Sequence, residues 1–439
     1  MTLAEARQPR LRRLLQAPAV RLLQGIALVC LELLPSLARG QGLGLSEEFE
    51  KGSDKEGIHL VMKRYPSLRF GNVLRVDFRA RFQADSRSFS PALDGEPTFE
   101  LRQARVGIQG VFLKRLEYEV EGELRDADKP WRDVYLNYRC FQGLQIQAGR
   151  FKVPFGLDQL TRITDQDYLF RSRAGDLLTP GRDVGLMAHG RFFKRGLSYQ
   201  AGLFRADGDN AGTGQQTAAV RLTGTPFRWL PAARLFKNLT VGVAATHSEL
   251  PEGLNSLRGR TLSRYTFFDR VFVSGRRVRL GTELDWGHGP FSMRGEFIQS
   301  EDTRLNQGVR SQNLPNLLGR GWYVSGTWMA TGEKKARGLK PRREFLREGG
   351  WGALELAARY EQLHFGSRAH SGPATIHPRA ANLLGNSERV STFGVNWYLN
   401  RHAKIQANVV HEEIEDRRRS PLAGQEHFWG QFIRLQLAF

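Results

Sequence analysis

The sequence has 439 residues, of which 40% are hydrophobic, 10% aromatic and 25% charged, and its formal net charge is +20 at pH 7. Mean hydropathy is −0.43, and beyond residue 40 no apolar run approaches the roughly 18 residues that a membrane-spanning helix needs. A helical membrane protein is therefore excluded. The apolar and aromatic content also excludes a disordered chain, so the sequence predicts one large folded domain or two ordinary ones.

The first 40 residues have the composition of an export signal. Arginines at positions 7, 10, 12, 13 and 21 precede the apolar stretch LLQGIALVCLELLPSLA, and Ala38 and Gly40 place small residues where a signal peptidase recognises them. We expect residues 1–40 to be a signal peptide that is cleaved after Gly40. The alternative is a short amphipathic helix kept in the mature chain, which Pro35 disfavours because proline interrupts helices.

Charge and cysteine content narrow the possible partners. Residues 1–40 contain six Arg and two Glu, so residues 41–439 carry 59 basic and 43 acidic side chains, a formal charge of +16. An excess of this size implies an anionic partner, which is nucleic acid, an acidic lipid headgroup or a small anion. Cys140 is the only cysteine beyond residue 40, so we expect no intrachain disulfide and no thiolate metal site.

Apolar and polar residues alternate strictly in many segments. In residues 74–82 the even-numbered positions are Leu, Val, Phe, Ala and Phe, whereas the odd-numbered ones are three Arg and Asp77. Because successive side chains of a strand point to opposite faces, one face of this segment is apolar and the other charged. Residues 116–124 repeat the pattern with glutamates at 117, 119, 121 and 123. Four carboxylates are costly to bury against a packed core, so the polar face must contact water.

Sixteen segments of this kind follow one another along the chain. They cover residues 73–83, 101–112, 116–125, 131–140, 144–151, 183–194, 196–205, 217–225, 239–248, 277–287, 290–300, 320–331, 351–364, 388–399, 402–413 and 427–439. Tight polar turns such as Lys114-Arg115 and Asn400-Arg401 alternate with long connections.

Short turns alternating with long loops, strands of about ten residues and a polar interior predict an all-β fold, a transmembrane antiparallel β-barrel of about 16 strands. Only a closed sheet satisfies every backbone group in lipid. A soluble β-sandwich or propeller is the alternative, but those folds bury their apolar faces against each other, and the sequence has no blade repeat.

Both chain ends are expected in the periplasm, which makes the 84–100 connection extracellular and the Lys114-Arg115 turn periplasmic. We divide the mature chain into an N-terminal periplasmic segment, 41–68, and a barrel domain, 69–439. Residues 41–66 lack strand alternation until Ile58, so they lie either free in the periplasm or against the lower rim of the barrel. The 332–350 connection departs from the scheme, because it is long although it falls on the periplasmic side.

The last eight residues, FIRLQLAF, form an alternating strand that ends on an aromatic residue. Ile433, Leu435 and Phe439 are expected to face lipid, with Arg434 and Gln436 facing the lumen. The terminal Phe resembles the signal that the outer-membrane assembly machinery recognises in barrel proteins.

Five stretches in register resemble the phosphate-selective porin O and porin P family. They are LQIQAGRFKVPFGLDQL from residue 144, TPGRDVGLMAHG from 179, GWYVSGTWMATGE from 321, GALELAARYEQL from 352 and GVNWYLNRHAKIQANVVHE from 394. The resemblance spans residues 69–439. It implies a sixteen-stranded, usually trimeric channel in the bacterial outer membrane, whose lumen carries arginine and lysine residues that attract phosphate or polyphosphate. It also implies that the third extracellular loop, here residues 152–182, folds into the pore.

The candidate anion-binding residues are basic side chains expected in the lumen or on this third loop. Arginine stays charged at any relevant pH and presents a fork of donors that matches phosphate oxygens, and several moderate sites in series let an ion leave as well as enter. The predicted set is Arg75, Arg79, Arg81, Arg105 and Arg150 on lumen faces, and Lys152, Arg171, Arg173 and Arg182 on the loop. The alternative for each is an ion pair with Asp77, Asp158 or the glutamate row.

The sequence therefore predicts a passive channel for inorganic phosphate or other small anions, embedded in outer-membrane lipid, with no cofactor. A row of four glutamates opposite a basic wall would create a transverse field, so a weakly selective general porin is the alternative function. An outer-membrane barrel enzyme is a more remote one, because HEEIE from His411 lacks the second histidine of a zinc motif and there is no G-x-S-x-G. Nucleic-acid binding is not expected, because the basic residues alternate with apolar ones instead of forming one patch.

Overall fold

The structure is a computed structural model that describes residues 57–62, 65–71, 73–90, 99–193, 196–208, 216–336, 338–347, 349–368, 372–422 and 424–439. The predicted signal peptide, residues 1–40, and most of the predicted N-terminal segment lie outside these ranges. Among the described residues, no helix has both the length and the apolar character to cross a bilayer.

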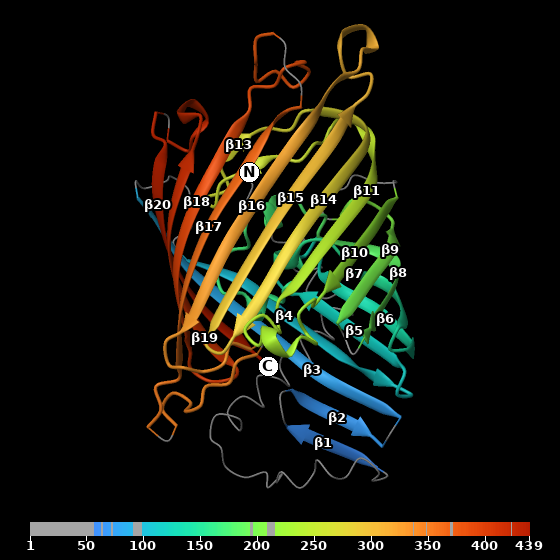
Figure 1. Cartoon of the computed structure of the whole chain (residues 1–439), viewed down its shortest axis with the longest axis vertical. Coiled ribbons are helices and arrows are strands. Elements are labelled where there is room, and N and C mark those ends of the chain that lie inside the picture. The colour runs from blue at the N-terminus through green and yellow to red at the C-terminus, as the bar shows by residue number, and fades with distance from the viewer. Residues whose placement is uncertain are drawn as a thin grey trace, which may run out of the picture.

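The fold is a single large antiparallel sheet (Figure 1). Sixteen of its strands form the barrel: β3 (Leu74–Ser90), β4 (Phe99–Phe112), β5 (Leu116–Glu123), β6 (Trp131–Phe141), β7 (Leu144–Lys152), β8 (Arg182–Phe192), β9 (Leu197–Phe204), β10 (Thr217–Gly224), β11 (Thr240–Leu254), β14 (Phe272–His288), β15 (Phe291–Arg304), β16 (Leu314–Met329), β17 (Ala353–Ser367), β18 (Asn386–Tyr398), β19 (Ala403–Ile414) and β20 (His427–Ala438). Each overlaps one of the sixteen predicted segments, so the strand count is confirmed.

The barrel closes between its first and last strands. Strand β20 pairs antiparallel with β3, and the aligned residues run from Trp429 opposite Ser90 to Ala438 opposite Arg81. The backbone of Phe439 completes the seam, because its N–H donates to the carbonyl of Ala80 at 2.8 Å and its carbonyl accepts from the Ala80 N–H at 3.1 Å. Every barrel strand therefore has a hydrogen-bonded neighbour on both sides, as a sheet in lipid requires.

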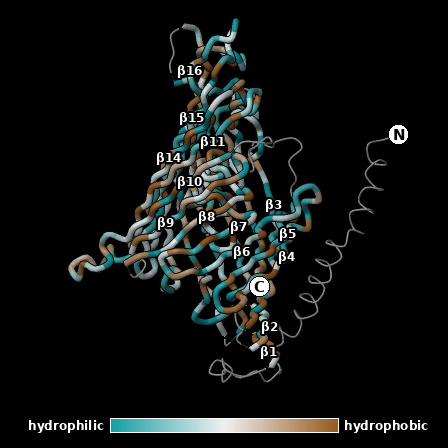
Figure 2. The backbone as a smooth tube through the Cα atoms, turned by 90° about the vertical axis from the view of Figure 1, so that its right-hand side faces the viewer, coloured by the Kyte–Doolittle hydropathy of each residue, from teal (hydrophilic) through white to brown (hydrophobic). Residues whose placement is uncertain are grey.

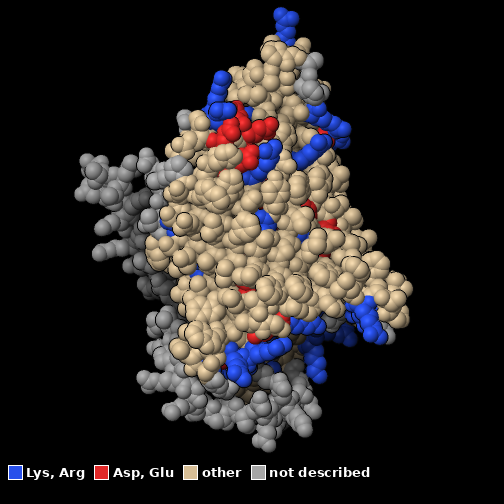
Figure 3. Space-filling model, turned by 60° about the vertical axis from the view of Figure 1, so that its left-hand side comes forward, with Lys and Arg blue, Asp and Glu red and all other residues tan. Residues whose placement is uncertain are grey.

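The distribution of side chains is the inverse of that in a soluble protein. Among the largest fully buried side chains are Arg277, Arg279 and Arg434, each at most 1% exposed, whereas Phe393 and Ile433 are 63% and 55% exposed. Hydrophobic and hydrophilic residues alternate along the strands (Figure 2), and the middle of the outer surface shows few charges (Figure 3). The apolar faces thus point outward to lipid and the charged faces inward, as the alternation predicts.

Several strands are longer than predicted at the end of the barrel that carries the long connections, which we call the long-loop end. Strand β3 continues to Ser90, β11 continues to Leu254, and β16 already begins at Leu314. The extensions lack the alternation of apolar and charged residues, because Ser86, Ser88 and Ser90 replace the apolar row of β3, and Pro251 and Pro315 interrupt the pattern in β11 and β16. The predicted 84–100 loop is shortened accordingly, since β3 ends at 90 and β4 starts at 99.

Two further strands precede the barrel. Strands β1 (Ile58–Met62) and β2 (Pro66–Phe70) form a hairpin, and β2 pairs with the first residues of β3, from Leu74 to Asp77. Because β20 pairs with β3 only from Arg81 onward, the hairpin covers the part of this edge that β20 leaves open. Strands β1 and β2 therefore lie against the rim (Figure 1), one of the two locations that the sequence left open for residues 41–66, of which 41–56 lie outside the described ranges.

Most connections at the opposite end, which we call the short-turn end, are tight, but two are long. One is the anticipated exception, residues 330–352 between β16 and β17, and the other comprises residues 225–239 between β10 and β11. At the long-loop end, the β11–β14 connection contains a small two-stranded sheet, β12 (Gly259–Arg260) and β13 (Thr266–Phe268). The helices α3 (Leu157–Leu160) and α4 (Arg173–Leu177) both lie in the connection between β7 and β8.

The seam leads to a first prediction about stability. The Phe439 ring stacks on His402 with centroids 5.1 Å apart, so Phe439→Ala should lower the free energy of unfolding by about 1 kcal/mol, the usual contribution of one aromatic pair. Urea unfolding of the barrel refolded in detergent measures this change. Phe439→Tyr is the matched control and should unfold like the wild type; equal loss in both variants would contradict a stacking role.

Candidate functional site

Residues 153–181, the connection between β7 and β8, make hydrogen bonds with residues of distant strands. The N–H of Leu157 donates to Oε1 of Glu296 on β15, and the N–H of Leu169 donates to Oδ1 of Asn408 on β19, both at 2.8 Å. The guanidinium of Arg434 on β20 donates to the Leu169 carbonyl at 2.8 Å. All these partners are interior residues of strands far from β7 and β8 in the sheet, so this segment contacts the opposite wall of the barrel.

An apolar cluster holds the same segment against that wall. Phe155 and Leu178 are fully buried and belong to one cluster with Ile298, Leu363 and Phe365 of β15 and β17. Further members come from the β11–β14 connection, including Phe267 and Phe268 of β13. Packed apolar side chains therefore fix this segment to strands β15 and β17.

Two of the predicted loop arginines hold the segment in place. The Arg173 Nε lies 3.2 Å from both carboxylate oxygens of Glu388 on β18. Burial by itself would lower the pKa of Arg173, but Glu388 and Asp176 outweigh burial and raise the pKa above its ordinary value. Arg171 donates to the backbone carbonyls of Asp158 and Thr161. Both guanidinium groups are thus engaged by the protein itself.

Lys152 and Arg182 belong to strands, which corrects their predicted position on the loop. Lys152 is the last residue of β7, and its Nζ donates to the carbonyls of Gln159 and Thr161 at 2.6 and 3.2 Å. Arg182 opens β8 and makes a bidentate pair with Asp133, at 3.1 and 2.7 Å. The predicted segments ended at residue 151 and began at residue 183, one residue short of the two strands, because Lys152 and Arg182 break the apolar pattern.

Arg150 does not face the lumen, contrary to the prediction. In register it lies between Val134 of β6 and Val184 of β8, and Val184 is 39% exposed on the outer face. Arg150 continues the row of Leu144 and Ile146, the lipid-facing residues of β7. It lies two positions before the end of the strand, where a long side chain can extend its charge toward water.

Four of the arginines of β3 and β4 form what we call the arginine wall: Arg75, Arg79, Arg81 and Arg105. Each is interleaved with carboxylates. Arg81 and Arg105 lie 3.2 Å from Glu121, Arg105 also lies 2.9 Å from Glu123, Arg79 pairs with Glu119 and lies 3.5 Å from Glu121, and Arg75 lies 2.6 Å from Asp77. The glutamate row is on β5, which pairs with β4, so it stands beside the arginines and not opposite them. The expected transverse field between two walls is therefore wrong in its geometry.

The structure adds basic residues that the sequence reasoning missed. Arg87 lies 2.6 Å from Glu100 near the long-loop end, and it had been assigned to the 84–100 loop. Arg277 and Arg279 share Asp207, with nearest separations of 2.6 and 2.5 Å. Arg277 and Arg279 already lie on the polar face of the predicted segment 277–287, whereas Arg87 is found only when β3 is extended to Ser90.

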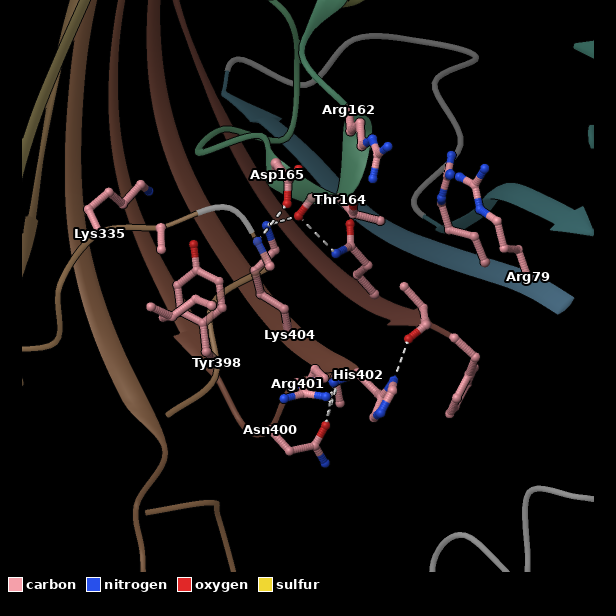
Figure 4. A pocket seen from close by; sticks show the side chains of 18 of the residues that line it. Arg79, Arg162, Thr164, Asp165, Lys335, Tyr398, Asn400, Arg401, His402 and Lys404 are labelled. Atoms are coloured by element: carbon pink, nitrogen blue, oxygen red, sulfur yellow. Dashed lines mark hydrogen bonds between the residues drawn. The ribbon is translucent and has the colours of Figure 1, made fainter. Parts of the chain in front are cut away.

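A cavity of about 230 Å³ opens at the short-turn end beneath the 153–181 segment (Figure 4). Its basic lining residues are Arg79, Arg81, Arg105, Arg162, Arg294, Lys335, Arg401 and Lys404, whereas the acidic ones are Glu121, Asp165 and Asp285. Arg162 and Arg79 border one side of this space in Figure 4, with Lys404 and Lys335 on the other. Three residues of the arginine wall are thus brought together with cations from distant strands and connections.

One of these cations, Lys335, joins the two unusual connections. It lies in the 330–352 connection and pairs with Asp167 of the 153–181 segment and with Glu355 of β17. Nearby, the N–H of Gly338 donates to Oδ1 of Asp165 at 3.0 Å. Burial by itself would raise the pKa of Asp167, but Lys335 and Arg294 outweigh it and lower the pKa below its ordinary value.

Comparison with known proteins identifies a family for this barrel. The family model described as phosphate-selective porin O and P matches residues 76–439. No curated protein matches the chain. Among the described residues, no group of three or more His, Cys, Asp or Glu is arranged to hold a metal ion.

Three solved structures share this fold at low sequence identity. A loop-deletion mutant of OmpT, an outer membrane protein of Vibrio cholerae, has a TM-score of 0.56 at 13% identity, covering 84% of this chain and 100% of its own. The trimer form of OmpT has a TM-score of 0.53 at 13% identity, with coverages of 84% and 100%. An anion-selective porin from Comamonas acidovorans has a TM-score of 0.53 at 11% identity, with coverages of 83% and 100%. At such identities the likeness shows the fold.

The interleaved charges give a second prediction. Glu121 is the carboxylate shared by Arg79, Arg81 and Arg105, so Glu121→Gln should raise the anion-to-cation permeability ratio by roughly twofold to fivefold, equivalent to about 0.4–1 kcal/mol for one partly screened charge. The reversal potential in a chloride gradient measures the ratio. Glu344→Gln is the control, since Glu344 pairs with the exposed Arg347 in the 330–352 connection. An unchanged ratio in Glu121→Gln would mean that ions do not pass this wall.

The Asp167–Lys335 pair gives a third prediction, about pH. Because the pKa of Asp167 is lowered in the folded protein, its stabilising effect is complete above the unfolded value of about 3.9 and is lost as pH falls through the folded value. Conductance fluctuations of single channels should therefore increase in acid as the 153–181 segment loosens. Asp167→Asn should show the same fluctuations at neutral pH. Asp126→Asn, which removes a partly exposed partner of Arg132, should leave the conductance fluctuations at the wild-type level. Identical traces for the two variants would contradict the tether.

Proposed function

Because the chain belongs to the phosphate-selective porin O and P family, we propose that it is an outer-membrane channel through which small anions, phosphate or polyphosphate among them, diffuse passively. The family and the barrel fold place the protein in the bacterial outer membrane, and they support a channel rather than an enzyme. The solute and its route are the new elements of the proposal.

The observation that carries the proposal is the charge of the cavity lining. Eight basic residues and three acidic ones border one space of about 230 Å³, which leaves an excess of positive charge in a confined volume. Arginine forks replace part of the hydration shell of an oxyanion, and the low-dielectric barrel around them strengthens the attraction. Several such groups in series attract an anion without trapping it.

We place the chain ends and the short turns in the periplasm and the long connections outside the cell. The 153–181 segment is then the third extracellular loop, and it narrows the pore. Its contacts with Glu296, Asn408 and Arg434 support this placement, since all three residues belong to the wall opposite its own strands. The passage runs between this segment and the arginine wall.

The predicted basic residues then separate into three roles. Arg79, Arg81 and Arg105 border the cavity and are proposed to contact the passing anion, with Arg75 at the rim, 46% exposed. Lys152, Arg171 and Arg173 are proposed to position the segment, because the backbone or Glu388 engages them. Arg182 is held by Asp133. We propose that it orients the arginine wall near Arg171 and adds to the positive field of that wall.

We also propose that the protein is a homotrimer in lipid. The trimer form of OmpT has the same fold, and the family resemblance implies the same assembly. The outward apolar band supplies the surface for both lipid and neighbouring copies.

A weakly selective general porin is the second candidate, and one observation favours it. Glu119, Glu121 and Glu123 neutralise much of the arginine wall, so the local excess of charge depends on cations from the other side of the cavity, such as Lys404 and Arg401. Saturable block by phosphate separates the two functions.

Single-channel conductance in planar bilayers provides the fourth prediction. The wild type should be anion-selective in a chloride gradient, and phosphate should block the chloride current with saturation. Arg81→Gln should weaken this block by about tenfold, the effect of one charge-assisted hydrogen bond of roughly 1.5 kcal/mol.

Arg81→Lys is the matched control, because it retains the charge but not the fork of donors. An intermediate block would support bidentate contact with phosphate. Chloride selectivity without phosphate block would favour the general porin, and a cation-selective pore would overturn both candidates.

A further inference from the structure

The connection between β10 and β11, residues 225–239, has an unusual composition for a turn. Its sequence is TPFRWLPAARLFKNL, with three basic residues, five large apolar or aromatic residues before Lys237 and no acidic residue. Trp229, Leu230, Leu235 and Phe236 are 54%, 53%, 46% and 48% exposed. A connection that met only water would not expose four such side chains together.

The segment is folded on itself. Hydrogen bonds join the N–H of Arg228, Leu230, Ala233, Phe236 and Leu239 to the carbonyl three residues earlier, at 3.0–3.3 Å for the first four and 2.8 Å for the last. Pro226 and Pro231 restrict the backbone further. The exposed side chains are therefore displayed by an ordered structure, which we call the lateral lobe.

Contacts fix the lateral lobe to neighbouring turns. The Trp286 Nε1 donates to the Leu235 carbonyl at 2.9 Å, and Asn238 donates to the Gly287 carbonyl at 3.2 Å. On the other side, the N–H of Thr225 donates to the Gly196 carbonyl at 2.8 Å. A Cβ on Gly196 would lie 2.1 Å from the Trp229 ring, so that ring packs directly on the backbone of the β8–β9 turn.

The lobe projects sideways from the barrel. It is the yellow-green coil in front of the lower barrel in Figure 1, and in Figure 2 it extends to the lower left, away from the wall. In Figure 3 it is the protrusion at the right, with Lys and Arg side chains beneath a tip of uncharged residues. A lobe that projects to the side of a barrel in lipid reaches into the surrounding membrane.

The lobe also continues the lipid-facing band. The outer faces of the adjacent strands carry Val220, Val241, Val243 and Leu280, which are 40–55% exposed. The exposed apolar side chains of the lobe extend this surface at the short-turn end. Aromatic residues next to basic ones are typical of the boundary between acyl chains and headgroups.

We propose that the lateral lobe is a membrane-interface anchor that binds anionic phospholipid. Trp229, Leu230, Leu235 and Phe236 insert among the acyl chains at the headgroup boundary. Arg228, Arg234 and Lys237 contact lipid phosphates, because basic side chains near an anionic leaflet are attracted to its surface. The inference rests on the outer-membrane location and not on the identity of the transported solute.

The depth of a spin label tests the anchor, as a fifth prediction. The label is attached at Leu230→Cys in the full chain with Cys30→Ser and Cys140→Ser, and the protein is reconstituted in phosphatidylcholine vesicles with or without phosphatidylglycerol. We expect the label to be more accessible to oxygen than to a water-soluble nickel chelate, and this excess to increase severalfold with phosphatidylglycerol. A label at Val309→Cys, 81% exposed in the β15–β16 connection, should favour the chelate in both vesicles.

A second variant separates the two parts of the anchor. Arg228→Gln, Arg234→Gln and Lys237→Gln together should remove the response to phosphatidylglycerol while the label at 230 still favours oxygen. Three results would overturn the proposal. The label at residue 230 could be more accessible to the chelate than to oxygen, or a second copy of the chain could protect it from both reagents. The third result is a label depth that does not change with phosphatidylglycerol. Channel conductance of the triple variant should stay at the wild-type value, so failure of the anchor is distinct from failure of the anion pore.

Discussion

The pairing of β20 with β3 is the constraint on which the rest of this structure depends. A sheet in lipid cannot leave an edge of unpaired N–H and C=O groups, because no water is present to satisfy them. Closing the sheet gives hydrogen-bond partners to the backbone groups of the last edge, from Trp429 to Phe439. Once the sheet is closed, every strand has one face in lipid and one face inside, and the period of two in the sequence decides which side chains go to each.

Closure places many charges inside a narrow space, and the interior is organised by the need to pair them. Arg434 pairs with Asp85 across the seam at 2.7 Å, and Arg173 pairs with Glu388 across the interior. A buried charge without a partner is far more costly than a paired one. The 153–181 segment therefore lies against the β15–β20 wall through both ion pairs and an apolar cluster, and the remaining space borders the arginine wall.

The same pairing limits how strongly the channel can select anions. The guanidinium groups of the arginine wall share carboxylates with one another, so a single arginine contributes only part of its charge to the passage. The excess arises where Arg162, Arg401 and Lys404 join the wall around one cavity. Selectivity is thus a property of the assembled lumen and not of any one strand. Lys335 shows the same principle, since it comes from a connection outside the barrel and pairs with Asp167 in its interior.

Alternation along the chain was sufficient to predict sixteen strands, their count and their lumen faces at Arg79, Arg81 and Arg105, because a strand in lipid has only two sides. It determined the closed all-β architecture for the same reason. It did not determine where strands end beyond the apolar band, as at Ser90, nor the side on which Arg150 lies, since a charge near a strand end is tolerated on either face. The partners of each arginine, the contact of Lys335 with Asp167 and the course of residues 153–181 were decided only by the tertiary structure. These contacts join residues far apart in the chain, and only closure of the barrel brings them within reach.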